Sequence, residues 1–443
     1  MQNKVYALLI ILAILAGSLF LSPAISVLMK SVTIGNSGQI SISTTPSNRT
    51  AASGRWQDIQ AAVNQVANAG GGNVYIPEGT FNFVEVGESW TGARVVIPAG
   101  VNVYGAPTER DVNNQVVEWR TILRIPWGDF GTWASVPVMF RIVGNGDPNK
   151  PSQFSDIKIV GFRSIDSSAA DRVANIQQIL RIDNTRDFRV DHCAFENFAY
   201  GITTWGFQCN GVIDHNRIYN TNGISVLTGY TNGNIMYGIQ VGRDYYSTGY
   251  GYEPLMSVLG KYTDHSIYIE DNYFSKFRHN VASNHGAHYV FRYNTIDQDF
   301  GDFSLDMHGL RDEGDNRWGT RAAEFYENTL TNAEVFRILQ TGGSSGVWFN
   351  NYIDDSYRAI TLYAEDYIPS DTWHLKDFYM WSAKGATPTL YYSNGEIDPS
   401  RNVVADWARQ TGNPADPNYP NVNPSWSIAG YRPYPYPHPL ALT

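Results

Sequence analysis

The chain is poor in charged residues, and this shortage narrows the possible functions. Only 17% of its 443 residues are charged, and 42 acidic against 32 basic side chains leave a formal net charge of −10. No run rich in Lys and Arg is present, so the chain lacks the basic surface that nucleic-acid phosphates require. We therefore expect no nucleic-acid partner. An anionic ligand would need local arginines or a bridging divalent cation.

Cysteine is equally scarce, with only Cys193 and Cys209 in the whole chain. No Cys/His spacing of the kind that binds zinc is present. A disulfide and two buried free thiols are both compatible with this sequence. Apolar residues, by contrast, make up 43% of the chain, which is enough to bury a large core.

One long apolar run lies at the N-terminus, from Val5 to Leu21. A basic start, an apolar stretch and small residues after it are typical of a secretory signal peptide over residues 1–26. Extended a few residues further, the run would span a bilayer as a membrane anchor, although Pro23 would interrupt such a helix. Both readings predict a secreted or cell-surface protein with a Ser/Thr-rich linker over residues 27–54.

Short segments with one shared pattern recur through the middle of the chain. Each has an apolar residue, two variable residues, an Asn, one variable residue and a second apolar residue. Where no insertion intervenes, successive Asn positions are 22 or 23 residues apart, a period typical of a solenoid. The segments are Ile269–Phe274, Phe291–Ile296, Phe325–Leu330 and Trp348–Ile353, with weaker fits at Ile213–Ile218 and at Val190–Phe195, where Cys193 takes the Asn place.

The residues between these Asn positions form short alternating runs rich in Val, Ile, Phe and Tyr, which indicates strands. The Leu framework of leucine-rich repeats is missing. Coils of 22–23 residues with three short strands each predict an all-β, single-stranded right-handed parallel β-helix over 55–370. Insertions are expected near 223–264 and 310–320, and an irregular last coil with a Pro/Tyr-rich strap over 371–443. A recurring Asn would hydrogen-bond the Asn of the coils above and below.

The start of this solenoid has a distinctive order of elements. An amphipathic helix is expected after Arg55, and Gly70-Gly71-Gly72 ends it. The strands VYIPEGTF and VVIPAGVNVYGA follow. This order resembles the N-terminal cap and first coils of the pectin-lyase-like (pectate lyase superfamily) right-handed parallel β-helix proteins. The resemblance implies the fold alone, because that fold carries lyases, hydrolases, esterases, epimerases and non-catalytic binders.

A candidate site lies on the strand that begins about nine residues after each repeated Asn. Outward side chains of successive coils, about 4.8 Å apart, would form one polar stripe. Elimination on a uronic-acid polymer needs a base for the proton α to the carboxylate, and an arginine or a cation for the resulting anion. The candidate catalytic residues are His285, Asp306, His308, Arg278, Arg321 and Arg337. The candidate substrate-binding residues are Trp205, Asn284, Arg311, Tyr363, Tyr245 and Tyr246, and Asp306 with Glu365 would form a calcium site, calcium being the one cofactor expected.

These candidates predict an enzyme that acts on a polysaccharide, with a lyase favoured over a glycoside hydrolase. Hydrolysis would need two carboxylates, for which Asp306 pairs with Asp312 or Glu365. A third possibility is a non-catalytic surface, filament or adhesin protein that uses the coil as a rigid spacer. The sequence lacks the motif sets of polygalacturonases and of pectate lyases, so the site rests on residue types. Acidic residues two places before the repeated Asn positions would form either a cation-binding row or a solvated one.

Overall fold

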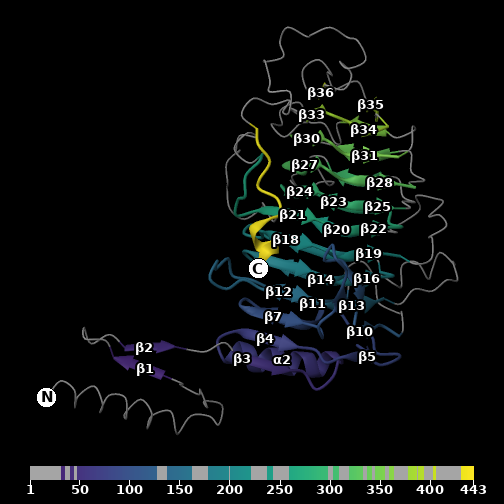
Figure 1. Ribbon diagram of the computed structural model, residues 1–443. Helices are drawn as coiled ribbons and strands as arrows, with labels where there is room; N and C mark the ends of the chain where they lie inside the picture. The colour runs from purple at the N-terminus through teal and green to yellow at the C-terminus, as the bar shows by residue number, and fades with distance from the viewer. Residues whose placement is uncertain are drawn as a thin grey trace.

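The structure, a computed structural model, confirms the predicted parallel β-helix (Figure 1). Three long sheets with parallel pairing stack coil upon coil around one right-handed solenoid. The described residues are 31–34, 40–43, 47–126, 137–161, 178–198, 200–220, 237–242, 259–297, 303–308, 319–332, 337–341, 345–354, 359–363, 378–386, 388–393, 403–405 and 431–443.

Each coil passes through the three sheets in the same order, which we call I, II and III. Sheet I contains β3 (Ser47–Thr50), β4 (Gly72–Tyr75), β7 (Val101–Tyr104), β12 (Gln153–Ser155), β15 (Phe188–Asp191), β18 (Gly211–Asp214), β21 (Ser266–Glu270), β24 (His288–Arg292), β27 (Ala322–Tyr326), β30 (Ser345–Phe349), β33 (Phe378–Trp381) and β36 (Val403–Ala405). Sheet II contains β5 (Gly79–Asn82), β10 (Thr121–Arg124), β13 (Ile157–Val160), β16 (Ala194–Glu196), β19 (Arg217–Tyr219), β22 (Tyr273–Ser275), β25 (Thr295–Asp297), β28 (Thr329–Thr331), β31 (Tyr352–Ile353) and β34 (Lys384–Gly385). Sheet III contains β6 (Ala93–Pro98), β11 (Val138–Val143), β14 (Gln178–Asp183), β17 (Tyr200–Trp205), β20 (Tyr237–Val241), β23 (His279–Ser283), β26 (Phe303–Met307), β29 (Arg337–Thr341), β32 (Ala359–Tyr363) and β35 (Thr389–Ser393).

Two features of the sheets differ from the sequence expectation. The strands extend beyond 55–370 at both ends, because β3 already pairs with β4 and because β36 pairs with β33. Strand β20 lies inside the segment expected to be one insertion, 223–264, and it pairs with β17 and β23 as a regular part of the solenoid. Its short YGIQV alternation was hidden among Tyr and Gly residues, whose turn preference dominates a reading of the sequence alone.

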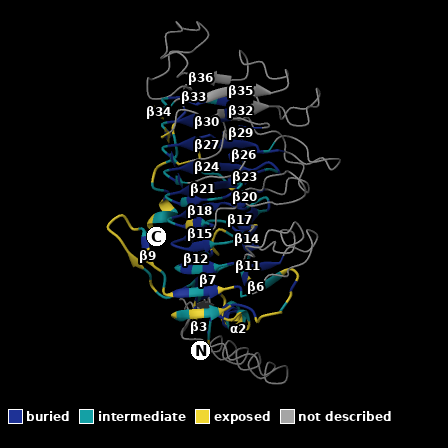
Figure 2. Cartoon of the chain, turned by 90° about the vertical axis from the view of Figure 1, so that its right-hand side faces the viewer, coloured by how far each residue is buried: buried dark blue, intermediate teal, exposed yellow. Residues whose placement is uncertain are grey.

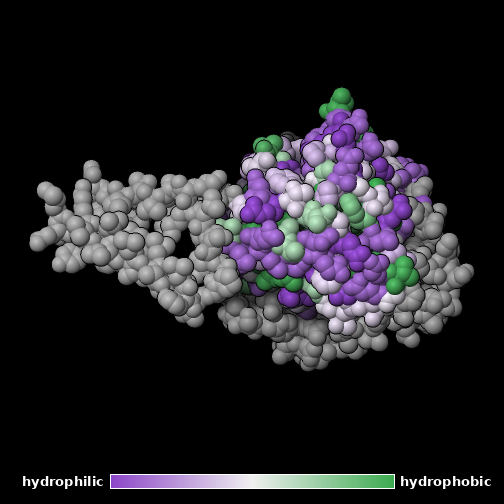
Figure 3. All heavy atoms as spheres, turned by 90° about the horizontal axis from the view of Figure 1, so that it is seen from below, coloured by the Kyte–Doolittle hydropathy of each residue, from purple (hydrophilic) through white to green (hydrophobic). Residues whose placement is uncertain are grey.

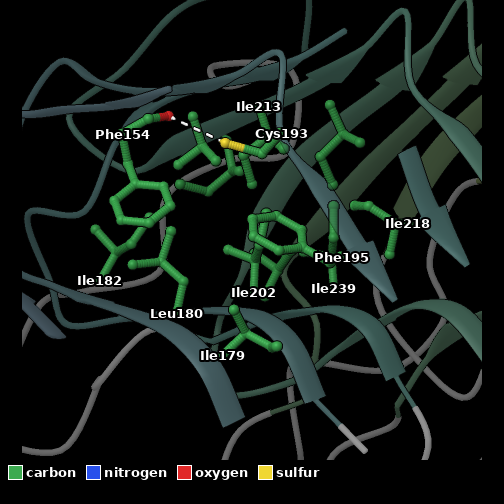
Figure 4. Packing of buried hydrophobic residues seen from close by; sticks show 14 of the residues in the cluster. Phe154, Ile179, Leu180, Ile182, Cys193, Phe195, Ile202, Ile213, Ile218 and Ile239 are labelled. Atoms are coloured by element: carbon green, nitrogen blue, oxygen red, sulfur yellow. Dashed lines mark hydrogen bonds between the residues drawn. The ribbon is translucent and has the colours of Figure 1, made fainter. Parts of the chain in front are cut away.

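The core consists of stacked columns of inward side chains, and each coil contributes several residues to it. On sheet III the pairing register aligns Leu180, Ile202, Ile239, Val281 and Leu305, all of which are fully or almost fully buried. Figure 4 shows the first three of these packed together within one hydrophobic cluster. Burying each such side chain contributes about 1.5–3 kcal/mol, so the stack of coils carries most of the favourable free energy of folding.

Cys193 and Cys209 are both free and buried. The Cys193 thiol lies 3.7 Å from the Phe154 carbonyl oxygen, the contact drawn in Figure 4. Burial is the main reason that the pKa of the Cys193 thiol lies well above its usual value. The two cysteines therefore behave as small core residues rather than as reactive thiols.

Helix α2 (Trp56–Asn68) covers the N-terminal end of the solenoid, as the amphipathic pattern predicts. Ile59, Val63 and Val66 are fully buried against the first coils. Gly72 then lies where β3 approaches so closely that a Cβ atom would stand 2.1 Å from the Ser47 carbonyl oxygen. Seen from below, most of the coloured surface at this end is hydrophilic (Figure 3), and the outer edge strand β3 is largely exposed (Figure 2). Within the described ranges, no helix combines the length and apolar character needed to cross a membrane.

The repeated asparagines form a hydrogen-bonded ladder at the corner between sheets I and II. The Oδ1 atoms of Asn272, Asn294 and Asn328 each accept the backbone N–H of the ladder residue one coil earlier, at 2.9–3.0 Å. Cys193 joins the ladder through its own N–H, which donates to Asn216 Oδ1 at 2.9 Å. The gap from Asn216 to Asn272 is therefore one coil with extra residues, as the spacing predicts.

The residue before each ladder position has a left-handed backbone. His192, His215, Asp271, Tyr293 and Glu327 all have φ between 52° and 58°. This conformation is uncommon for residues other than glycine, and its recurrence shows that these coils turn the corner in the same way. The identical corner keeps the strands on either side in one register from coil to coil.

Asn294→Ala is expected to lower the free energy of unfolding by about 2–5 kcal/mol, because buried polar groups of Asn272, Ile269 and Arg292 would lose a hydrogen-bond partner. Urea denaturation monitored by circular dichroism would measure this loss. The control is Asn113→Ala, since the Asn113 side chain is exposed, and this variant should stay within about 0.5 kcal/mol of the wild type. Equal losses in the two variants would contradict a stabilising role for the ladder.

The acidic row on the outer face of sheet I is buried and ion-paired, not solvated. Arg189 donates through Nε and Nη2 to both carboxylate oxygens of Asp214, at 3.0 and 2.9 Å. Arg292 lies 2.6 Å from Glu270, and both side chains are fully buried. The arginines come from neighbouring coils, and a pattern built on single repeats does not pair them with the acids.

The C-terminal strap, residues 431–443, covers this row and is drawn in yellow in Figure 1. The Arg292 guanidinium donates to the Tyr434 and Pro435 carbonyl oxygens at 2.7 and 3.0 Å. The His438 N–H donates to Glu270 at 2.7 Å. The strap therefore supplies hydrogen-bond partners that the buried Arg292–Glu270 pair needs, which explains how this pair is tolerated away from water.

His438→Asn is expected to flatten the loss of stability in mild acid. Burial, together with the charge of Arg292, lowers the pKa of His438 from 6.5 to about 4. Between these two pH values the unfolded chain binds a proton that the folded chain does not, so this contribution is present above pH 6.5 and is lost as the pH falls toward 4. At about pH 5 the difference amounts to about 2 kcal/mol. Asn retains an acceptor for the Leu440 N–H, which His438 Nδ1 binds at 3.2 Å.

Urea midpoints of both proteins at about pH 7.5 and about pH 5 would test this prediction. Glu270 and Asp271, whose pKa values are raised mainly by burial, act in the opposite direction, but both proteins share them. The comparison therefore isolates His438. The same pH dependence in wild type and variant would contradict the assignment.

Candidate functional site

The outer face of sheet III carries a continuous row of polar side chains. The register places Arg141, Arg181, Thr203, Gln240 and Asp306 in one line across neighbouring strands. Ala282 occupies the place between Gln240 and Asp306. Asp306 is the one member of this row among the predicted site residues, and the shared register brings it into line with the others.

The centre of the stripe is an acid flanked by two histidines. Asp306 is almost fully buried, and its Oδ2 atom lies 3.0 Å from His308 Nε2 and 3.6 Å from His279 Nε2. The His308 side chain remains 35% exposed, so it is the member of this group that a ligand can reach. Burial would raise the pKa of Asp306, but the charges of His308, His279 and Arg278 and the hydrogen bond from His308 lower it overall.

Backbone pairing fixes His308 at the end of β26. Its N–H donates to the Ser283 carbonyl at 3.0 Å, and its own carbonyl accepts the Thr320 N–H at 2.9 Å. Ser283 and Thr320 are also joined through their hydroxyl groups at 2.7 Å. The corner between sheets III and I is thus tied together beneath the imidazole, which holds it against Asp306.

Trp205 and His285 form an aromatic platform on the same face. Their ring centroids lie 4.7 Å apart at an interplanar angle of 68°. The indole occupies the space over Gly242, where a Cβ atom would stand 2.6 Å from Trp205 Cε3. Gly242 directly follows β20, so the absence of a side chain there lets the ring lie across the next coil.

Two arginines lie further along the stripe toward the N-terminal end. Arg141 and Arg181 are direct neighbours on β11 and β14, and their Nε atoms contact the same carboxylate, Asp183, at 2.5 and 2.9 Å. Their side chains are 42% and 35% exposed. One buried carboxylate therefore holds two accessible guanidinium groups.

The structure brings together only part of the predicted site. Asp306, His308 and Arg278 form one electrostatic cluster, and Trp205 and His285 form the platform beside it. Asn284 is half-buried and donates its N–H to the Val241 carbonyl at the end of β20. Arg321 is buried just before β27, where its N–H donates to Ala287.

The remaining predicted residues are not tested by side-chain geometry. The backbones of Arg337 and Tyr363 lie in β29 and β32, but their side chains are outside the described part of the structure. Arg311, Tyr245, Tyr246 and Glu365 lie outside the described residues altogether. The expected calcium pair of Asp306 and Glu365 is therefore also untested. Among side chains that the structure does place, no group of three or more His, Cys, Asp and Glu could hold a metal ion.

Two functional features were missed by the sequence reading. Arg141 and Arg181 lie in coils that precede the clear Asn repeats, so the repeat pattern gave them no register. Gly242 looked like a turn residue within an insertion. The signal that could have found the arginines is the alternation in VMFRIV and QILRID, in which an arginine lies between two buried apolar residues.

Comparisons with known proteins concern the fold. No protein-family model and no curated protein matches the sequence. Among solved structures, an alginate lyase from Paenibacillus sp. str. FPU-7 is 11% identical and covers 81% of this chain and 99% of its own, with a TM-score of 0.43. The A-module of the Azotobacter vinelandii mannuronan C-5 epimerase AlgE4 is 16% identical, with 79% and 92% covered and a TM-score of 0.45.

A third similar structure is the tailspike protein of E. coli bacteriophage HK620 in complex with a pentasaccharide, which is 15% identical, with 84% of this chain and 63% of that chain covered and a TM-score of 0.47. All three are pectate-lyase-like parallel β-helix proteins. At these identities and TM-scores the likenesses carry no argument about the chemistry of this chain. The three parallel sheets themselves establish the architecture that the sequence resemblance implied.

Gly242→Ala is expected to displace the Trp205 ring and to cost about 1–3 kcal/mol of stability, because the new methyl group overlaps the indole. Near-ultraviolet circular dichroism and urea denaturation would report the two effects. In a Trp205→Leu background the same change should cost less, since the overlapping ring is gone. A cost that is independent of residue 205 would show that the indole does not occupy this space.

Proposed function

We propose that the protein is a polysaccharide lyase that cleaves a uronic-acid-containing polymer by β-elimination on the outer face of sheet III. The observation that carries this proposal is the partly exposed His308 imidazole held against buried Asp306, with Arg278 and His279 acting on the same carboxylate. A base, its orienting acid and a cation are the groups that elimination next to a carboxylate requires.

The hydrogen bond to Asp306 assigns the roles of the two imidazole nitrogens. Nε2–H of His308 donates to Asp306, so the neutral ring carries its lone pair on Nδ1. Nδ1 takes the proton from the sugar carbon next to the carboxylate. The released electron pair forms the carbon–carbon double bond, the bond to the neighbouring glycosidic oxygen breaks, and the imidazolium returns a proton to that oxygen through water. His308 is the catalytic residue, and Asp306 is a positioning residue.

Arg278 offsets the charge that develops on the substrate. Deprotonation next to a carboxylate builds negative charge on the carboxylate oxygens, and a fixed guanidinium stabilises that anion more than it stabilises the ground state. The charge of Arg278 lowers the pKa of Asp306, the residue that holds His308, and this supports the proposed role.

Hydrolysis is less well supported by the same residues. A glycoside hydrolase needs a carboxylic acid that stays protonated to donate to the leaving oxygen, and such an acid has a raised pKa. Asp306 has a lowered pKa. Asp183, the other carboxylate on the described part of this face, is engaged by Arg141 and Arg181. Elimination, which uses an imidazole base, fits this set of groups better.

The platform supports a polymer rather than a small molecule as the substrate. Trp205 lies beside the row that leads to Asp306, and an indole face stacks on sugar rings. The expected secretory segment or anchor would bring the protein to a compartment outside the cytoplasm, where such polymers occur. A long ligand laid along the stripe would contact one coil after another.

Incubation with a panel of uronate and neutral polysaccharides, with and without calcium, tests the proposal. We expect an unsaturated uronate product, detected by its ultraviolet absorbance, and about 10²–10⁴-fold slower formation with His308→Gln. Asp306→Asn should slow the reaction about 10²–10⁴-fold, because an amide lacks the carboxylate charge and can donate to Nε2, which favours the wrong tautomer of the imidazole. New reducing ends without unsaturation would establish hydrolysis instead, and neither product from any polymer would contradict an enzymatic role.

The chain offers a matched control for these variants. His215 also contacts an aspartate, with its Nδ1 atom 2.9 Å from Asp214 Oδ2, but it uses the other ring nitrogen and lies at the corner between sheets I and II. His215→Asn removes that imidazole and retains a residue type that tolerates the left-handed backbone. This variant should keep wild-type activity. Equal loss in His215→Asn and His308→Gln would indicate a general effect on folding.

A further inference from the structure

The pairing of Arg141 with Arg181 is unusual for two residues whose only role is structural. They face each other on neighbouring parallel strands, where like charges are destabilising. One carboxylate, Asp183, serves both, so the group keeps one excess positive charge on the surface of a protein whose formal net charge is −10. An anion from outside the chain would complete the neutralisation.

The geometry of the contacts leaves the binding edges of both guanidinium groups available. Each arginine contacts Asp183 through Nε. No hydrogen bond joins the terminal Nη atoms of Arg141 or Arg181 to another described residue. Asp183 therefore holds each guanidinium group at its Nε side. The opposite side, with the two Nη atoms, is available to bind a carboxylate through two parallel hydrogen bonds.

Arg141 and Arg181 lie on the same face of sheet III as the proposed catalytic centre. Both arginines lie in the same outward row as Asp306. The strand order β14-β17-β20-β23-β26 separates Arg181 from Asp306 by four strand spacings, which is about 19 Å. Trp205 and Gly242 lie between them on the same face. One sugar unit of an extended polymer is about as long as the spacing between two neighbouring coils.

We propose that Arg141 and Arg181 form a distal subsite for a carboxylate of an acidic polysaccharide, about four or five sugar units from the sugar that reacts at His308. This inference rests on the proposed function and adds a second contact point to it. The pair holds the chain in line with the stripe and takes no part in bond breaking. Substrates too short to span the distance do not gain from it.

The test compares Arg141→Gln/Arg181→Gln with the wild type on an acidic polymer and on its trisaccharide. For the polymer the apparent KM should rise about 3- to 20-fold, with kcat unchanged, because two partly exposed charge pairs are lost. For the trisaccharide both constants should stay the same. Both side chains are substantially exposed, and thermal unfolding should confirm that the variant folds. A fall in kcat, or an equal KM change on both substrates, would overturn the inference.

Arg217→Gln is the matched control, because Arg217 is an exposed arginine on sheet II, where it stacks on Tyr219 and Tyr273. It should leave the polymer KM unchanged. Binding is measured separately, by gel retardation in acidic and in neutral polymers, using His308→Gln with and without the arginine substitutions. Retardation that is specific to acidic polymers and lost with the arginines would support the subsite even if no elimination occurs. Elimination without this difference would leave the proposed function intact and reject the subsite.

Discussion

The regular corner between sheets I and II is the constraint on which the rest of the structure depends. There a ladder of amides passes from coil to coil, and the residue before each amide turns the chain with a left-handed backbone. Because the side chains of a strand alternate between its two faces, a slip of one residue would turn the core outward and the polar stripe inward. The ladder penalises such a slip, since a misplaced coil would leave buried amides without partners.

Long-range charge pairing adds a second layer of specificity. On sheet I, Arg189 and Arg292 are buried with acids from adjacent coils, and the C-terminal strap completes the coordination of Arg292. On sheet III, Asp183 holds Arg141 and Arg181 and Asp306 holds His308, and these three side chains remain partly exposed. Both sheets thus contain carboxylates that bind basic side chains. On sheet I the C-terminal strap covers these pairs. On sheet III the arginine and imidazole groups remain accessible.

The proposed chemistry follows from this difference between the two faces. Asp214 and His215 match Asp306 and His308 in residue type and in contact distance, but His215 makes the contact through Nδ1 and His308 through Nε2, and the two pairs lie at different corners of the coil. What distinguishes His308 is that Arg278 acts on the same carboxylate, and that the row also holds an indole platform and a pair of arginines. A long acidic polymer requires such alignment over several coils, which a single motif does not describe.

The sequence by itself determined the solenoid, its three strands per coil, the ladder and the inward column, because each of these depends on periodicity that repeats along one chain. It also indicated Asp306 and His308, which are two residues apart at the end of β26. Only the tertiary structure decided that the acidic row of sheet I is buried, that β20 belongs to a regular coil and that Arg141 and Arg181 share Asp183. These three features depend on contacts between neighbouring coils. Because insertions change the number of residues between coils, the contacting residues can be identified only in the folded chain.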